Sequence, residues 1–263
     1  MNLPALSHAV AALCREAGGF IRHEAQHFDQ RRVESKGLHD LVSYVDQQAE
    51  RLLVTGLKKL LPEAGFVTEE GTTAQTAAEY RWIIDPLDGT TNFIHGLPCY
   101  CVSVALAQHA EPVLGVVYEV SRDELFRAAL GHGAFLNEQP IRVSQAARLA
   151  DSLIATGFPF RDFERMAAYL RVMEAFMRDS RGLRRWGSAA LDLAYVACGR
   201  FDAYFEFNIN AYDVAAGILL VREAGGQVSR WLEAGDPVFS RETLATNGLL
   251  HAPMQAVMRQ HWA

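Results

Sequence analysis

Acidic residues that could hold a metal ion recur where the predicted strands of this chain end. These acids are Glu69, Glu70, Asp85, Asp88 and Asp213. Carboxylates are costly to bury near one another unless cations compensate their charge. Acids that converge from several strand ends therefore suggest a divalent metal site, and an all-oxygen ligand set favours Mg²⁺ or Mn²⁺ over zinc.

The segment 85-DPLDGTTNF-93 contains two of these acids within four residues. Pro86 fixes the chain direction just after a predicted strand, so Asp85 and Asp88 can face the same ion. The same turn can present the main-chain carbonyl of Leu87 as a further oxygen ligand. The alternative interpretation is an ordinary turn rich in Pro, Asp and Gly, with an Asp that caps a helix.

The residues that follow Asp88 could bind an anion beside the metal. Gly89 permits a close approach of the backbone. A helix that begins at Gly89 and Thr90 would leave their amide N–H groups free to seat a phosphate. Thr90 also has a hydroxyl group that could hold a water molecule.

Hydrophobic periodicity predicts the elements that position these residues. Residues 6–25 and 43–61 carry apolar stripes at helical spacing, and Pro62 ends the second helix. Strand-like runs at 65–70 and 81–85 deliver acids at their ends, and residues 101–136 read as a meander of strands. Further helices are predicted near 163–178, 188–198 and 214–224 and after 253, with strands at 202–207 and 227–230.

This order of elements predicts a layered α/β or α+β sandwich with two sheets. The 263 residues contain neither a repeat nor a low-complexity linker, and large α/β enzymes often fill this length with one continuous core. We therefore expect a single domain over residues 1–263. Its N-terminal lobe would be about 1–145, with the metal motifs, and its C-terminal lobe about 146–263, with Asp213.

Composition limits the classes of partner. The formal net charge of −6 and the pI near 5.8 provide no excess of Lys and Arg for nucleic acid. Charges interrupt every apolar run before the ~20 residues that span a bilayer, so no membrane partner is predicted. Arg15 and Glu16 break the apolar period where a secretory signal would be uninterrupted, and four irregularly spaced cysteines form no disulfide framework. We expect a cytoplasmic protein.

Five strings resemble, in order and spacing, the motifs of the inositol monophosphatase family, especially its bacterial members. The resemblance spans nearly the whole chain and implies a layered αβαβα sandwich with two β-sheets, of the inositol monophosphatase/fructose-bisphosphatase-like type. It also implies a homodimer. The strings are 36-KGLHDLVSYVD-46, 68-TEE-70, 85-DPLDGTTNFIH-95, 187-GSAALDLAYVACG-199 and 206-EFNINAYDVAAG-217.

The resemblance implies ligands for two or three Mg²⁺ ions. Glu69, Asp85 and the Leu87 carbonyl would hold the first ion, which activates the attacking water. Asp85, Asp88 and Asp213 would hold the second, which stabilises the leaving oxygen.

Other family positions imply catalytic and substrate contacts. Glu70 would lie at the edge of the site, near a third ion. A paired threonine and aspartate, Thr90 and Asp46, would orient and deprotonate the water beside Glu69. The substrate contacts that the resemblance implies are Asp88, Gly89, Thr90, Ser188, Ala189, Glu206 and Asp213.

Physical chemistry agrees with these roles. Phosphate monoesters hydrolyse extremely slowly, so an enzyme must above all supply charge neutralisation and alignment. Paired metals supply both. Because no CxxxxxR phosphatase loop is present, we expect water to attack the phosphate directly, without a Cys or His nucleophile.

Some positions depart from the family or allow a simpler interpretation. Tyr212 stands where the family motif usually has Trp, which leaves an aromatic residue before Asp213. Taken alone, Asp46 and Glu206 would be solvated acids on a helix and at a strand end. Arg184 and Arg185 are expected to be exposed or at a subunit contact rather than in the site.

The expected function is Mg²⁺-dependent hydrolysis of myo-inositol monophosphate and related polyol phosphates. One alternative is a phosphatase of the same superfamily for histidinol phosphate, fructose bisphosphate or a 3′-phosphoadenosine nucleotide. Residues 206–212 contain no Lys or Arg, which favours a neutral polyol. A second alternative is a non-catalytic regulatory or scaffold protein. Every expected metal position retains its carboxylate, and this favours an enzyme.

Overall fold

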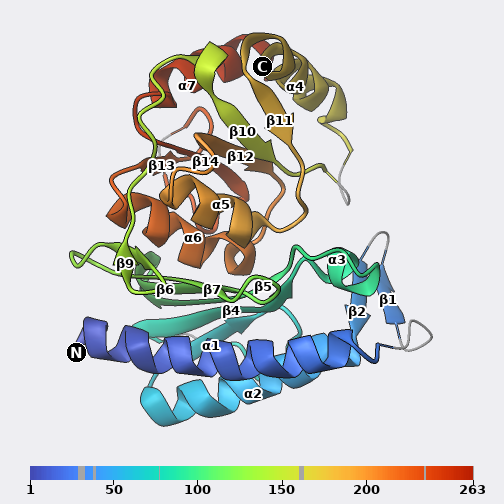
Figure 1. Ribbon diagram of the computed structural model, residues 1–263, viewed down its shortest axis with the longest axis vertical. Helices are drawn as coiled ribbons and strands as arrows, with labels where there is room; N and C mark the ends of the chain where they lie inside the picture. The colour runs from blue at the N-terminus through green and yellow to red at the C-terminus, as the bar shows by residue number, and fades with distance from the viewer. Residues whose placement is uncertain (29–32, 38–39, 77, 160–162, 234, 263) are drawn as a thin grey trace.

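The computed structural model describes residues 1–28, 33–37, 40–76, 78–159, 163–233 and 235–262, and it shows helices and sheets stacked in layers (Figure 1). The helices are α1 (Leu3–Ala25), α2 (Tyr44–Leu60), α3 (Thr90–Ile94), α4 (Met166–Asp179), α5 (Ala189–Ala197), α6 (Ala211–Glu223) and α7 (His251–His261), with a short 3₁₀ turn at Leu149–Asp151. The strands are β1 (Val33–Gly37), β2 (Asp40–Ser43), β3 (Gly65–Thr68), β4 (Tyr80–Asp88), β5 (Cys101–Gln108), β6 (Glu111–Glu119), β7 (Glu124–Ala129), β8 (Ala134–Leu136), β9 (Gln139–Pro140), β10 (Leu153–Thr156), β11 (Gly182–Arg184), β12 (Ala203–Phe207), β13 (Gln227–Ser229) and β14 (Glu242–Thr246).

The strands of the described residues form two sheets and one separate ribbon. The larger sheet has seven strands in the order β3-β4-β5-β6-β7-β8-β9, and the smaller has five in the order β11-β10-β12-β14-β13. In the larger sheet β3 is parallel to β4, and the following neighbours are antiparallel. In the smaller sheet β10 is parallel to both β11 and β12, whereas β14 runs antiparallel to β12 and β13. Strands β1 and β2 form the ribbon.

The layers follow from which sheet face each helix covers (Figure 1). Helices α1 and α2 cover the outer face of the larger sheet, α5 and α6 lie between the two sheets, and α4 and α7 cover the far face of the smaller sheet. This arrangement is the αβαβα sandwich that the sequence predicted. The chain passes from the larger to the smaller sheet between Pro140 and Leu153, where we propose the boundary between the lobes.

Alternating side chains explain why the larger sheet is buried on both faces. Successive residues of a strand point to opposite faces, so Trp82 and Ile84 of β4 pack under α1 and α2 while Ile83 packs toward α5 and α6. The inner face carries small residues that let a helix approach closely. A Cβ atom at Gly115 would lie 2.7 Å from the carbonyl oxygen of Ala216 in α6.

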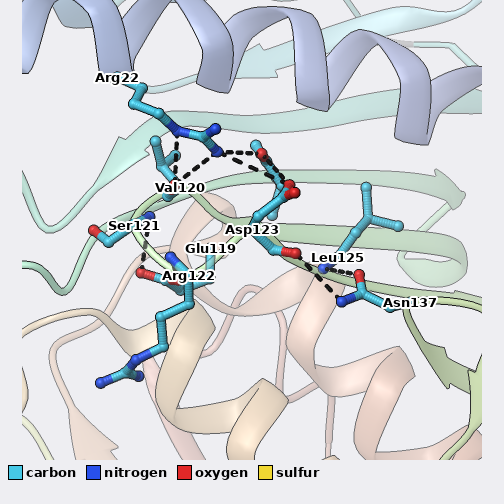
Figure 2. Close-up of polar contacts among 9 residues, drawn as sticks. Arg22, Glu119, Val120, Ser121, Arg122, Asp123, Leu125 and Asn137 are labelled. Carbon is cyan, nitrogen blue, oxygen red and sulfur yellow. Dashed lines mark hydrogen bonds and ion pairs between the residues drawn. The ribbon is translucent and has the colours of Figure 1, made fainter.

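The connection between β6 and β7 joins the outer helix layer to the middle one (Figure 2). Arg22 of α1 donates from Nε and Nη2 to the carbonyl oxygen of Val120, at 3.1 and 2.8 Å. The buried carboxylate of Glu119 accepts the backbone N–H groups of Ser121 and Arg122. These bonds pair the carbonyl and N–H groups of a tight turn and hold the turn against α1.

The side chain of Arg122 extends this connection toward α5. Its guanidinium group donates to the hydroxyl of Tyr195 and lies 5.3 Å from the ring centroid of Trp186. Because Tyr195 belongs to α5 and Trp186 lies two residues before the cap Ser188, the turn helps to position that helix.

Several elements differ from the sequence prediction. The β1–β2 ribbon, β11 and β14 were not predicted, because each is short and lacks a long apolar alternation. Strand β4 continues to Asp88 instead of ending at Asp85. No described helix combines the length and apolar character that a membrane-crossing segment requires.

Candidate active site

A pocket of about 520 Å³ opens where the end of β4 meets the first turns of α5 and α6. It is built from distant parts of the chain, because β4 belongs to the larger sheet and both helices lie in the layer between the sheets. Of the residues predicted for the site, those that line it are Glu69, Asp85, Leu87, Asp88, Gly89, Thr90, Ser188, Ala189, Glu206 and Asp213.

Three of the carboxylates that line this pocket lie close together. Among the described residues, Asp85, Asp88 and Asp213 each place one carboxylate oxygen within 4.8 Å of the others, and all three side chains belong to one potential metal site. Asp85 and Asp88 come from β4. Asp213 lies in the first turn of α6, so the expectation that it ends a strand was wrong.

A break in the strand ladder explains how Asp85 and Asp88 face the same point. Asp85 pairs with Ser103 and Asp88 pairs with Cys101, so three steps along β4 match two steps along β5. Residues three apart in a regular strand would point to opposite faces, and the extra residue of the bulge removes this difference. Pro86, which has no N–H group to give to the ladder, lies at the irregularity. The proline therefore creates a bulge where we expected a strand end.

Asp88 is held by the start of α5. Its Oδ2 atom accepts the hydroxyl of Ser188 at 2.8 Å and the backbone N–H of Ala190 at 2.7 Å. Burial raises the pKa of Asp88 to about 6, although the donors of α5 act in the opposite direction. This anchoring connects the larger sheet to the middle helix layer at the site itself.

Asp213 is held by its own helix. The backbone N–H of Asn210 donates to its Oδ2 atom at 2.8 Å, and the two residues form a capping box at the start of α6. Burial, followed by the nearby charge of Asp88, raises its pKa to about 7. Tyr212, the residue that replaces the usual Trp, packs its ring against the core between the sheets.

The electrostatics of this cluster fit a divalent cation. Burial raises the pKa of Asp85 well above the ordinary value, and the charges of Glu69, Asp88 and Asp213 raise it further. Buried carboxylates at this separation repel one another in their ionised form. A hard cation reverses that repulsion, and carboxylate and carbonyl oxygens are the donors that Mg²⁺ prefers.

The two glutamates after β3 take different positions. Glu69 lines the pocket, and its backbone N–H donates to the carbonyl oxygen of Ile84 in the neighbouring strand at 3.3 Å. Glu70 does not line the pocket. Its backbone N–H donates to the carboxylate of Glu50 in α2 at 2.7 Å. The role of Glu70 at the edge of the site, near a third ion, stays a prediction.

Thr90 and Asp46 lie together although they are distant in sequence. The Thr90 hydroxyl is 2.9 Å from Asp46 Oδ1 and 3.0 Å from the carbonyl oxygen of Leu87, and it can donate its proton to either. Asp46 is fully buried and also accepts the N–H and hydroxyl of Ser43 at the start of α2. Burial raises its pKa, and these hydrogen bonds lower it. It is not the solvated surface acid of the simpler interpretation.

Gly89 is required by the backbone at the start of α3. Its φ is +100°, and a Cβ atom there would lie 2.8 Å from the carbonyl oxygen of Cys99. L-residues with side chains rarely adopt such a φ. The glycine thus lets the chain turn sharply from the acids of β4 into α3.

Glu206 of β12 also lines the pocket. Alternation along β12 places Tyr204 and Glu206 on the face toward the middle helices, and the Tyr204 hydroxyl donates to Glu206 Oε2 at 2.7 Å. Burial raises the pKa of Glu206 to about 8. Gly157 makes room for this carboxylate, because a Cβ atom at 157 would lie 2.1 Å from it.

Two charged residues of the pocket were missed by the sequence analysis. Arg185 is exposed, as expected, but it lines the pocket, so its exclusion from the site was wrong. Asp192 also lines the pocket, from α5. Its spacing of four residues from Ser188 indicates a shared helix face and was the available signal.

Comparison with known proteins places the whole chain in one group. The model of the inositol monophosphatase family matches residues 3–263. The chain is 45% identical over 237 residues to the Nus factor SuhB of Xylella fastidiosa, covering 90% of this chain and 86% of that protein. It is 42% identical over 252 residues to an inositol-1-monophosphatase of Rhizobium meliloti, covering 93% and 95%. A solved inositol monophosphatase from Anabaena has a TM-score of 0.88 and 34% identity, covering 99% of this chain and 98% of that one.

Proposed function

Because the chain belongs to the inositol monophosphatase family, we propose that it is a Mg²⁺-dependent phosphatase of small polyol monophosphates, myo-inositol monophosphate among them. The observation that carries the proposal is the convergence of Asp85, Asp88 and Asp213 beside a pocket of about 520 Å³. The name of the relative from Rhizobium meliloti supports the substrate class.

The residues that would hold two Mg²⁺ ions are Glu69, Asp85, the Leu87 carbonyl, Asp88 and Asp213. Bound Mg²⁺ would neutralise charge on the phosphate and make a water molecule more acidic. The carboxylates themselves are arranged before any ligand enters. Backbone N–H groups fix Asp85, Asp88 and Asp213 at 2.7–3.0 Å, so little reorganisation is needed when charge develops.

The pair of Thr90 and Asp46 would position the nucleophile. When the Thr90 hydroxyl donates to Asp46, at 2.9 Å, its oxygen is free to accept a hydrogen bond from the attacking water. The water proton can then pass to Thr90 as the Thr90 proton passes to Asp46. Asp46 suits this role because burial raises its pKa.

The remaining pocket residues would orient the substrate. The amides of Gly89 and Thr90 open α3 beside the acids and would seat the phosphate. Ser188, Ala189 and Glu206 also line the pocket, and the hydroxyl groups of a polyol would bind against them.

The substrate within this class depends on more than the 206–212 segment. That segment has no cation, but Arg185 lines the pocket, so a second anionic group on the substrate would also find a partner. We keep the neutral polyol as the proposed substrate, with histidinol phosphate, fructose bisphosphate and 3′-phosphoadenosine nucleotides as the alternatives. We further propose a cytoplasmic homodimer, on the basis of family membership.

A panel of phosphate monoesters tests the proposal. Phosphate release is measured with and without Mg²⁺ for the wild type, for Asp88→Asn, and for Asp179→Asn as a control at a partly exposed carboxylate outside the pocket. We expect Mg²⁺-dependent turnover of inositol monophosphate, lost by about 10²-fold or more in Asp88→Asn and retained in Asp179→Asn. Stronger turnover of histidinol phosphate than of inositol monophosphate would make histidinol phosphate the assigned substrate. Equal turnover with and without Mg²⁺ would contradict the proposed Mg²⁺ dependence.

A regulatory role is the second candidate, because the relative from Xylella fastidiosa is named a Nus factor. Such a role would depend on the protein surface and not on the buried acids. The Asp88→Asn variant separates the two, because it should lose phosphate release while keeping its fold. Full regulatory activity of that variant, measured beside its lost turnover, would show that this chain has both functions.

A further inference from the structure

Asp192 is a buried acid of the pocket that the proposed mechanism does not use. It lies in the first turns of α5, four residues after the helix cap Ser188, and only 2% of its surface is exposed. It lines the same pocket as the metal-binding acids. Its Oδ1 atom makes no hydrogen bond to any described residue.

The usual structural reasons for a buried acid do not account for Asp192. Buried polar groups are normally hydrogen-bonded, but the cap of α5 is already supplied by Ser188, whose hydroxyl accepts the N–H of Leu191 at 3.4 Å. Among the described residues, Arg185 is the cation that lines the pocket. Its guanidinium group lies 5.5 Å from the ring centroid of Phe158, and its charge lowers the pKa of Asp192 against the larger effect of burial. No described residue, however, donates a hydrogen bond to Asp192 Oδ1.

The position of Asp192 relative to Glu206 indicates what the oxygen could bind. Both acids line the same pocket, and the charges of Glu206 and Asp88 contribute, after burial, to the raised pKa of Asp192. One oxygen of Glu206 accepts the Tyr204 hydroxyl. The pocket thus offers two hydrogen-bonding carboxyl groups in addition to the cluster of Asp85, Asp88 and Asp213. A ligand with adjacent hydroxyl groups can satisfy both, whereas a hydrocarbon would leave them unpaired.

We propose that Asp192 is a specificity-determining residue that binds a hydroxyl group of the alcohol released from the phosphate. The proposal rests on the proposed phosphatase function and extends it to the choice of leaving group. Polyhydroxylated alcohols would be selected over hydroxyl-free ones of the same size, because only the former fill the hydrogen-bonding capacity of Asp192.

Inositol 1-phosphate and cyclohexyl phosphate test this selection, since they share a six-membered ring and differ in its hydroxyl groups. The ratio of their kcat/KM values is measured with Mg²⁺ for the wild type, Asp192→Ala, Asp192→Asn and the control Asp179→Asn. We expect the ratio to fall about tenfold in Asp192→Ala, the size of one lost hydrogen bond to a carboxyl group. Asp192→Asn keeps an oxygen acceptor and should lose less, and Asp179→Asn should keep the wild-type ratio.

The outcomes separate the two proposals. If Asp192→Ala lowers turnover of both esters equally, or lowers neither, Asp192 does not select the leaving group. Thermal unfolding of each variant shows whether an equal loss is a loss of folded protein. If the wild type hydrolyses neither ester, the phosphatase proposal fails by itself. In that case the dissociation constants of both esters, measured by calorimetry, test the role of Asp192. A Kd ratio that is the same in Asp192→Ala as in the wild type would overturn the proposal that Asp192 binds a hydroxyl group.

Discussion

Two groups of acids line the pocket and are held in different ways; we call the cluster of Asp85, Asp88 and Asp213 the metal end and the pair of Glu206 and Asp192 the substrate end, after their proposed roles. At the metal end, backbone N–H groups hold each of the three acids, from Leu87 to Asp85, from Ala190 to Asp88 and from Asn210 to Asp213. At the substrate end, Glu206 is held by the side chain of Tyr204, and Asp192 leaves an oxygen without a hydrogen-bond partner among the described residues. Groups held by the main chain are fixed by the fold, whereas groups held by side chains change with one substitution. Under the proposed function, the metal end would therefore set the reaction and the substrate end would set the choice of substrate.

The largest expected effect comes from removing a hydroxyl group at the metal end. Thr90→Val deletes the hydroxyl that contacts Asp46 and keeps the side-chain shape, so the water loses its positioning group and proton path. We expect kcat to fall by on the order of 10²-fold for every monoester, with Thr90→Ser recovering most of the loss. A loss confined to hydroxylated substrates would break the division between the two ends.

The second expected effect is a change in the free energy of unfolding with pH. The pKa values of Asp88 and Asp213 are raised to about 6 and about 7, so between about pH 4 and pH 7 the folded protein binds more protons than the unfolded chain. The free energy of unfolding of the Mg²⁺-free protein should therefore fall as the pH rises through this window.

Mg²⁺ sharpens this second test. Mg²⁺ competes with protons for the carboxylates, which are ionised at pH 8 and partly protonated at pH 5, so it should raise the unfolding temperature more at pH 8 than at pH 5. Asp213→Asn should flatten the metal-free pH profile, and Asp179→Asn should leave it unaltered. Mg²⁺ stabilisation that is equal at both pH values would contradict the raised pKa values of the cluster.

The smallest effect is expected at the substrate end. In Gly157→Ala the new methyl group would lie 2.1 Å from the Glu206 carboxylate and must displace it. We expect the KM for inositol 1-phosphate to rise about tenfold, the loss of one hydrogen bond, with a smaller rise for cyclohexyl phosphate. Gly19→Ala, at a position of α1 with open space around it and no positive φ, is the control. An equal rise of KM for both esters would show that Glu206 does not distinguish hydroxylated from hydroxyl-free substrates.

Elements with long apolar patterns could be predicted from the sequence, because the spacing of their apolar residues indicates which face is buried. Helices α1 and α2 and the meander from β5 to β7 are of this kind. The short segments β11 and β14 become strands because they pair with neighbouring strands, and a local sequence pattern does not show this pairing. Pro86 was interpreted as the end of a strand, since its missing N–H group has the same local signature in a bulge and at a stop.

The site could be predicted where a motif places acids close together, as in 85-DPLDGTTNF-93. The sequence grouped Asp213 with these acids as a strand-end residue, and that reason was wrong because Asp213 lies in α6. The family resemblance gave the same grouping on another basis, since no local rule relates residues more than a hundred positions apart. Arg185 and Asp192 were missed for a different reason. A single charged residue is usually solvated, and only the packed structure shows that these two line the pocket.

The hydrogen bonds from α5 to Asp88 also bear on how the protein is synthesised. The third acid of the cluster is residue 213, and a chain emerging from the ribosome begins to fold from its N-terminus. The larger sheet can assemble before α5, which holds Asp88, and the last acid have been translated. A nascent or prematurely terminated chain that stops short of residue 213 therefore lacks the assembled cluster of Asp85, Asp88 and Asp213, and under the proposed function it would have no hydrolytic activity.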